Sequence, residues 1–92
     1  MKNYLKLIKM LESKIQKKII DKLKKDGFFI IKIIRANISG IPDILAIKNG
    51  KVFFIEVKTD NGKLSEIQKH RIQQIKENGI EVFIWKDYEI NF

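Results

Sequence analysis

Three residues in the middle of the sequence have the types and spacing of a metal-dependent hydrolytic site. Asp43 follows the Gly-Ile-Pro turn at 40–42, and Glu56 and Lys58 lie two residues apart in a run rich in β-branched and aromatic residues. Alternate side chains of a β-strand share a face, so Glu56 and Lys58 are expected to point to the same side. Two carboxylates on one face of a sheet can hold a divalent cation, and an ammonium beside them can act on the groups that react there.

These residue types suit metal-assisted hydrolysis of a phosphodiester. Mg²⁺ is usually held by one or two carboxylates together with water and substrate phosphate oxygens. An ammonium beside the metal, here that of Lys58, can orient or acidify the attacking water and offset charge in the transition state. The Glu-x-Lys pair alone carries little weight, because a chain with 19 Lys and Arg residues produces such exposed pairs by chance.

The two carboxylates are expected on neighbouring antiparallel strands, which the sequence predicts at 44–48 and 51–58. The dipeptide Asn49-Gly50 between them is a strong hairpin signal. A two-residue turn at this point places Asp43 near Glu56. Neighbouring strands lie about 4.8 Å apart, so the two carboxylates are able to share one metal ion.

Two amphipathic helices are expected to flank these strands. The first covers about 3–25 and ends at Asp26-Gly27. The second covers about 66–77, with Ser65 as its N-cap and Asn78-Gly79 as its end signal. Their buried stripes are expected to comprise Tyr4, Ile8, Leu11, Ile15 and Ile19 in the first helix and Ile67, Ile72 and Ile75 in the second.

One polar residue falls inside each stripe, and each has two interpretations. Glu12 either points to the edge of the core near the other carboxylates or extends along the surface to pair with Lys9 or Lys14. Gln68 either contacts the same site or closes the capping box of residues 65–68 by bonding back to the N-cap backbone. The sequence leaves both pairs of alternatives open.

Two further strands complete the expected sheet, at 28–35 and 80–85, and 88–92 forms either a short edge strand or an ordered tail. The order of elements is therefore αβββαβ. This order predicts an α/β fold in which a mixed four-stranded sheet is flanked by helices. A length of 92 residues predicts a single domain over 1–92.

The composition narrows the choice of partner and compartment. A formal net charge of +8 favours a polyanion such as DNA, although lysines that merely fill exposed helix positions would give the same excess. The absence of cysteine excludes disulfides, thiolate zinc sites and thiol nucleophiles. No apolar run is long enough for a signal peptide or a membrane span. We therefore expect a cytoplasmic protein without a membrane partner, encoded by a cell, a phage or a virus.

Three motifs resemble those of the VRR-NUC family, the virus-type replication-repair nucleases of the PD-(D/E)XK superfamily. They are Gly-Ile-Pro-Asp at 40–43, Phe-Ile-Glu-Val-Lys-Thr at 54–59 and Gly-Lys-Leu-Ser-Glu-Ile-Gln at 62–68. The resemblance spans about 12–85 and implies a restriction-endonuclease-like αβββαβ core that uses Mg²⁺ or Mn²⁺ to cleave structured DNA. Archaeal Holliday-junction resolvases share this superfamily core and a similar charge, so the third motif is the one that points to VRR-NUC.

The resemblance also implies roles for individual residues. The implied catalytic residues are Asp43, Glu56, Lys58 and Gln68, and the implied metal ligands are Glu12, Asp43, Glu56 and the backbone carbonyl of Val57. Stand-alone viral members of the family are associated with homodimers that cut four-way junctions, which suggests the same assembly and a place in DNA repair for this chain.

Our hypothesis is therefore a Mg²⁺-dependent endonuclease that acts on branched DNA, including Holliday junctions. Two alternatives come from other classes. One is a non-catalytic, structure-selective DNA-binding protein on the same fold, which would bind junctions without cutting them. The other is a protein-interaction domain whose positive charge is incidental.

Overall fold

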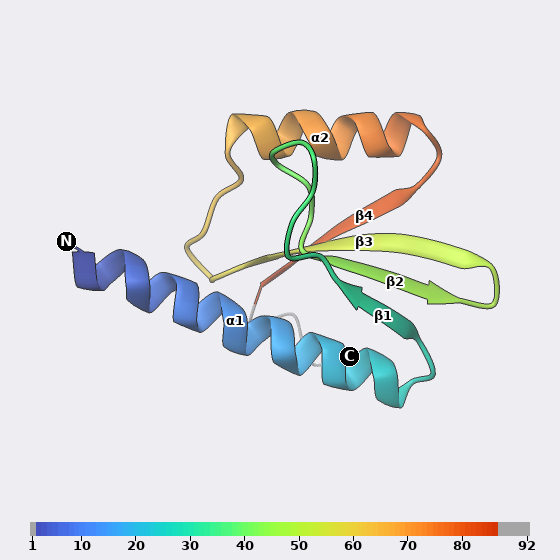
Figure 1. The fold of residues 1–92 in the computed structure, drawn as a ribbon, viewed down its shortest axis with the longest axis horizontal. Coiled ribbons are helices and arrows are strands. Elements are labelled where there is room, and N and C mark those ends of the chain that lie inside the picture. Colours follow the sequence, from blue (N-terminus) through green and yellow to red (C-terminus); the bar gives the residue numbers. More distant parts are fainter. Residues whose placement is uncertain (1, 87–92) are drawn as a thin grey trace.

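A computed structural model describes residues 2–86 as one sheet with a helix on each face (Figure 1). Its elements are α1 (Lys2–Lys25), β1 (Phe29–Lys32), β2 (Ile44–Lys48), β3 (Lys51–Lys58), α2 (Glu66–Glu77) and β4 (Glu81–Lys86). This confirms the predicted αβββαβ order and the mixed four-stranded sheet. The stretch 88–92, expected as an edge strand or tail, lies outside the described residues.

The sheet has the strand order β1-β2-β3-β4, and only the last pairing is parallel. The β2–β3 hairpin turns at Asn49 and Gly50, whose φ angles of 51° and 80° suit the tight turn that such hairpins favour. Its register pairs Ile44 with Ile55, so Asp43, one residue before β2, falls beside Glu56. The predicted proximity of the two carboxylates is confirmed.

The core lies between α1 and one face of the sheet. Buried residues of the helix are Ile15, Ile19 and Leu23, and those of the strands are Ile44, Ala46, Ile55 and Val57. The first half of α1 extends past the sheet (Figure 1). Tyr4 and Leu11, predicted as part of the buried stripe, are therefore 64% and 42% exposed.

On the opposite face α2 packs over the β3–β4 side of the sheet, where Ile72 and Val82 are buried (Figure 1). Ile67 was expected in the same stripe, but it is 40% exposed. Its helical turn lies against the loop before β2 rather than against the sheet, since a Cβ at Gly40 would approach the Ile67 carbonyl oxygen to 2.8 Å. The buried stripe of α2 is thus shorter than predicted.

The first and last strands differ from the prediction at both ends, since β1 covers 29–32 instead of 28–35 and β4 covers 81–86 instead of 80–85. β1 ends at Lys32 rather than Arg35, because its partner β2 begins only at Ile44 and one further hydrogen bond, from the Ile33 N–H to the Asp43 carbonyl, ends the pairing. β4 starts at Glu81, because the Ile80 N–H is used to close the end of α2 on the Ile75 carbonyl. Within residues 2–86 neither helix is apolar enough over its length to cross a membrane.

Candidate active site

The open end of the β2–β3 hairpin, opposite its turn, brings two carboxylates together at one end of the sheet. The Asp43 Oδ2 accepts a hydrogen bond of 3.0 Å from the Val57 N–H, which fixes the aspartate against β3. Glu56, the residue before Val57, is 2% exposed and lies within electrostatic and hydrogen-bonding reach of Asp43. The register of the hairpin thus places Asp43 and Glu56, two residues of the predicted site, next to each other.

Glu56 is a buried carboxylate with donors on only one of its oxygens. Its Oε2 lies 3.7 Å from the Lys58 ammonium and accepts a 3.4 Å hydrogen bond from the Gln68 amide nitrogen. Its Oε1 is buried and has no hydrogen-bond partner among residues 2–86. A buried charged oxygen without a partner is costly, so this atom needs a proton or a cation.

The pKa of Glu56 reflects this environment and is raised from 4.5 to about 8. Burial is the largest cause, the charge of Asp43 and a hydrogen bond to it come next, the Lys58 ammonium opposes the rise, and Glu12 adds to it. Two ionised carboxylates side by side repel each other and neither can donate a hydrogen bond, so the raised pKa favours a proton on Glu56. At neutral pH the pair therefore retains a proton unless a cation takes its place.

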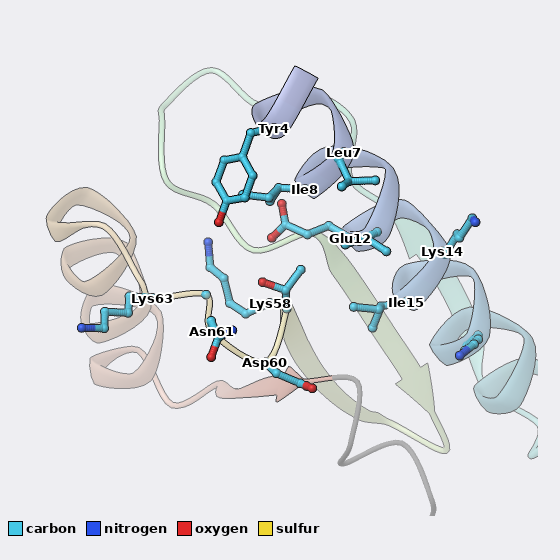
Figure 2. A pocket seen from close by; sticks show the side chains of 14 residues that line it. Tyr4, Leu7, Ile8, Glu12, Lys14, Ile15, Lys58, Asp60, Asn61 and Lys63 are labelled. Carbon is cyan, nitrogen blue, oxygen red and sulfur yellow. The ribbon is translucent and has the colours of Figure 1, made fainter. Parts of the chain in front are cut away.

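Glu12 reaches the same site from α1. It is half-buried, and burial raises its pKa, while the Lys58 ammonium lowers it and the Asp43 carboxylate raises it further. Figure 2 shows the Glu12 and Lys58 side chains pointing into the same space between α1 and the end of β3. The interpretation of Glu12 as a carboxylate at the edge of the core is therefore the one that the structure supports.

Gln68 satisfies both of its interpretations at once. The Gln68 side-chain oxygen accepts a 2.9 Å hydrogen bond from the Ser65 backbone N–H, and the Gln68 backbone N–H donates to the Ser65 hydroxyl at 3.2 Å. These two bonds make the complete capping box. The remaining amide nitrogen then faces Glu56. The helix cap orients the amide that holds the buried glutamate.

This donor set fits a hard divalent cation. Asp43 and Glu56 offer carboxylate oxygens, and the partnerless Glu56 Oε1 is an atom that a cation would satisfy. No group of three acidic or histidine side chains in the described part of the chain is close enough to hold a metal ion alone. Two carboxylates with water and phosphate oxygens suffice for Mg²⁺. Ligation by Glu12 and by the Val57 carbonyl stays a prediction.

A second set of contacts, which sequence reasoning missed, ties the Asp43 loop to α2. The Arg71 Nε donates to the Ser39 carbonyl at 2.9 Å. Gly40 has a φ of +82° and lies too close to the Ile67 carbonyl for any Cβ, so only glycine fits there. The helix that carries Gln68 thus also positions the loop that carries Asp43. The Gly-x-Pro-Asp motif was the available signal for the glycine, but no signal indicated Arg71.

An open cleft of about 570 Å³ adjoins the site and was also missed. One wall is α1, and the other is the loop that follows β3 (Figure 2). Glu12 and Lys58 lie where the cleft meets the site.

Comparison with known proteins agrees with this geometry. The sequence profile described as VRR-NUC domain matches residues 5–86. The chain belongs to the VRR-NUC family. A solved structure described as a VRR_NUC domain superposes with a TM-score of 0.76 at 25% identity, covering 87% of this chain and 89% of that one. The resemblance seen in the three VRR-NUC motifs is therefore confirmed, as is the fold that it implied.

One curated relative carries the name of an enzyme. It is the crossover junction endodeoxyribonuclease Hjc of Sulfurisphaera tokodaii, which is 35% identical over 83 residues. The match covers 78% of this VRR-NUC chain and 56% of the relative, so the chain spans little more than half the length of that protein.

Proposed function

We propose that this VRR-NUC chain is an endodeoxyribonuclease that uses Mg²⁺ or Mn²⁺ to hydrolyse phosphodiester bonds in branched DNA, including four-way junctions. The observation that carries the proposal is the buried Glu56, whose Oε1 has no partner among the described residues and which lies beside Asp43 and Lys58. The name of the Sulfurisphaera relative supports the choice of branched DNA. The +8 net charge supports a nucleic-acid substrate.

Asp43 and Glu56 are the residues that would hold the cation. When bound, the cation supplies Lewis acidity toward a phosphate oxygen and makes water a better nucleophile at neutral pH. Gln68 keeps the Glu56 carboxylate in position through the amide that the helix cap has oriented. Because the Asp43 side chain is held by the Val57 N–H, its second oxygen is left for the cation.

Lys58 is the residue placed to act on the reacting groups. Its side chain is 14% exposed, and its ammonium lies 3.7 Å from the Glu56 Oε2, so it stays beside the carboxylates rather than in bulk water. From there the ammonium can orient the attacking water and offset the negative charge that develops on the phosphate oxygens. This role requires a positive charge at one position and does not require Lys58 to bind the cation.

We further propose that the chain acts as a homodimer. The β1–β2 side of the sheet is not covered by α2 (Figure 1). Four large apolar residues are exposed there, namely Phe29 (65%) and Ile31 (40%) of β1 and Ile34 (88%) and Ile38 (44%) of the loop between β1 and β2. A two-fold interface on this apolar patch would present two sites to a substrate that is itself two-fold symmetric. A cytoplasmic location and a role in DNA repair stay predictions.

The test is a panel of end-labelled DNA structures of one sequence, namely linear duplex, nicked duplex, flap and four-way junction, incubated with Mg²⁺ or Mn²⁺. The proposal expects the wild-type protein to cut the branched members and the Asp43→Asn variant to bind them without cutting. Binding of junctions by the wild type without cleavage at any Mg²⁺ or Mn²⁺ concentration would favour the non-catalytic DNA-binding protein instead. Weak binding to all members at physiological salt would favour the protein-interaction domain.

A further inference from the structure

We propose that the cleft between α1 and the loop after β3 binds one unpaired nucleotide of the substrate strand, immediately beside the phosphodiester to be cut. This inference rests on the proposed function, since it assigns the cleft to the DNA strand that enters the site. It adds a property that the active-site residues do not specify, namely that the bound strand must be unpaired at this position.

The two walls of the cleft match the two surfaces of a nucleobase. Tyr4, Leu7 and Leu11 of α1 line it and are 64%, 51% and 42% exposed, although they are large and apolar. The opposite wall is the polar turn at 59–62, which also lines the cleft. A base presents apolar faces that stack on aromatic rings and a polar edge that forms hydrogen bonds.

The polar wall is held in place before any ligand binds. The Gly62 N–H donates to the Thr59 carbonyl at 2.9 Å, which closes the turn. The Lys86 ammonium donates to the Asp60 carbonyl at 3.2 Å and ties the turn to β4. A preformed wall reduces the entropy that is lost when a nucleotide binds.

The charges around the cleft favour a phosphate-linked ligand over an apolar one. The positively charged residues that line it are Lys14, Lys18, Lys58 and Lys63, and the negatively charged ones are Glu12 and Asp60. Figure 2 shows the Lys58 ammonium pointing into the cleft and Lys14 and Lys63 pointing away from it, so Lys58 is the cation that would meet a phosphate there, while the apolar α1 wall would contribute nothing to binding phosphate alone. A ligand with both a base and phosphates uses both features.

The dimensions of the cleft select for an unpaired nucleotide. Its volume of about 570 Å³ is within the range of pockets that hold single drug-sized ligands, roughly 300–1,000 Å³. A paired base is stacked inside the duplex and has to leave that stack before its face can lie against the α1 wall. A base can therefore enter only where the strand is unpaired or easily opened, as at a branch point.

The position of Tyr4 connects the cleft to the site. In Figure 2 its ring lies above the cleft, and its hydroxyl points toward the Lys58 ammonium. A base stacked on this ring would have its backbone phosphate near Lys58 and Glu12. Tyr4 is therefore expected to position the strand without taking part in the chemistry.

The experiment measures binding without cleavage, using wild-type protein in Ca²⁺ and two DNAs of one sequence, a continuous duplex and a four-way junction. Tyr4→Ala is compared with Leu5→Ala, because Leu5 is also 64% exposed and does not line the cleft. Base–aromatic stacking is worth about 1–3 kcal/mol, so Tyr4→Ala should weaken junction binding roughly 5- to 150-fold. Duplex binding should change less than twofold, and Tyr4→Phe and Leu5→Ala should match the wild type on both DNAs.

Photocrosslinking provides a second readout with wild-type protein. A 5-iodouracil placed at each position around the branch point is expected to crosslink at one position to a peptide that contains Tyr4. Crosslinks only to peptides outside α1, or an equal effect of Tyr4→Ala on junction and duplex, or no effect of it on either, would overturn the inference.

These measurements can refute the cleft assignment and the proposed nuclease function independently of each other. A protein that never cuts DNA in Mg²⁺ or Mn²⁺, but loses junction binding in Tyr4→Ala, would contradict the nuclease and leave the cleft assignment standing. A protein that cuts junctions, but whose Tyr4→Ala variant binds them like the wild type, would contradict the cleft assignment alone.

Discussion

Replacing Glu56 by glutamine should make the metal-free protein more stable at neutral and alkaline pH. The carboxyl is 2% exposed, and its pKa is raised from 4.5 to about 8, mainly by burial and by the neighbouring Asp43. At a pH between these two pKa values, Glu56 keeps a proton in the folded protein and releases it in the unfolded chain. The free energy of unfolding of the wild type therefore falls as pH rises through this interval.

The size of the effect follows from the same two values. Each pH unit between 4.5 and about 8 corresponds to about 1.36 kcal/mol. The loss of stability is therefore roughly 3 kcal/mol from pH 5 to pH 7 and roughly 5 kcal/mol when complete above pH 8. For a domain whose total stability is about 5–15 kcal/mol, this is a large fraction.

The assay is urea denaturation in EDTA at half-unit steps from pH 5 to pH 9. Glu56→Gln should lose most of the decline, because its amide has no charge and can donate a hydrogen bond to Asp43, while the raised pKa of Glu12 leaves a smaller decline in the same direction. Glu66→Gln is the control, since that side chain is 93% exposed and lies on the first turn of α2, and it should keep the wild-type slope. A flat wild-type profile, or an equal decline in Glu56→Gln, would refute the reasoning.

Three further predictions concern catalysis, the Asp43 loop and assembly. Lys58→Ala should bind junctions and fold like the wild type but cut them at least ~100-fold more slowly; a gel assay showing activity within a few-fold of the wild type would contradict the mechanism. Gly40→Ala should lower the free energy of unfolding by about 2–4 kcal/mol, because it combines a positive φ with a contact of 2.8 Å to the Ile67 carbonyl. Gly50→Ala has a positive φ but open space around it, so denaturation should show a loss of only about 1–2 kcal/mol, and equal losses would argue against the contact. Ile34→Glu should convert a dimer to a monomer in sedimentation velocity, since Ile34 is 88% exposed on the apolar patch; a wild type that sediments as a monomer at every concentration would exclude this interface.

The sequence predicted those parts of the site that depend on local rules. Asn49-Gly50 fixes a two-residue turn, and that turn fixes the register that places Asp43 beside Glu56. The capping box that orients Gln68 was predictable because it has a known pattern and a known direction, whereas the contact of Gln68 with Glu56 was one of two alternatives that the sequence left open. In each case one short segment determines the geometry.

The parts that were missed depend on contacts between distant segments. Helical periodicity placed Tyr4 and Leu11 in the buried stripe, but periodicity does not say where the sheet under a helix ends. The contact between Arg71 and the Ser39 carbonyl joins residues 32 positions apart and has no sequence signal. The raised pKa of Glu56 likewise depends on how deeply the finished fold buries it.

The most direct test of the shared-cation site is a crystal structure of the protein grown with Mn²⁺, with an anomalous difference map to locate the ion. We predict one peak bonded to both Asp43 and Glu56, with ligand distances of about 2.0–2.3 Å and the Lys58 ammonium nearby but not bound. A peak elsewhere on the chain, or no peak between these two carboxylates at saturating Mn²⁺, would contradict the account.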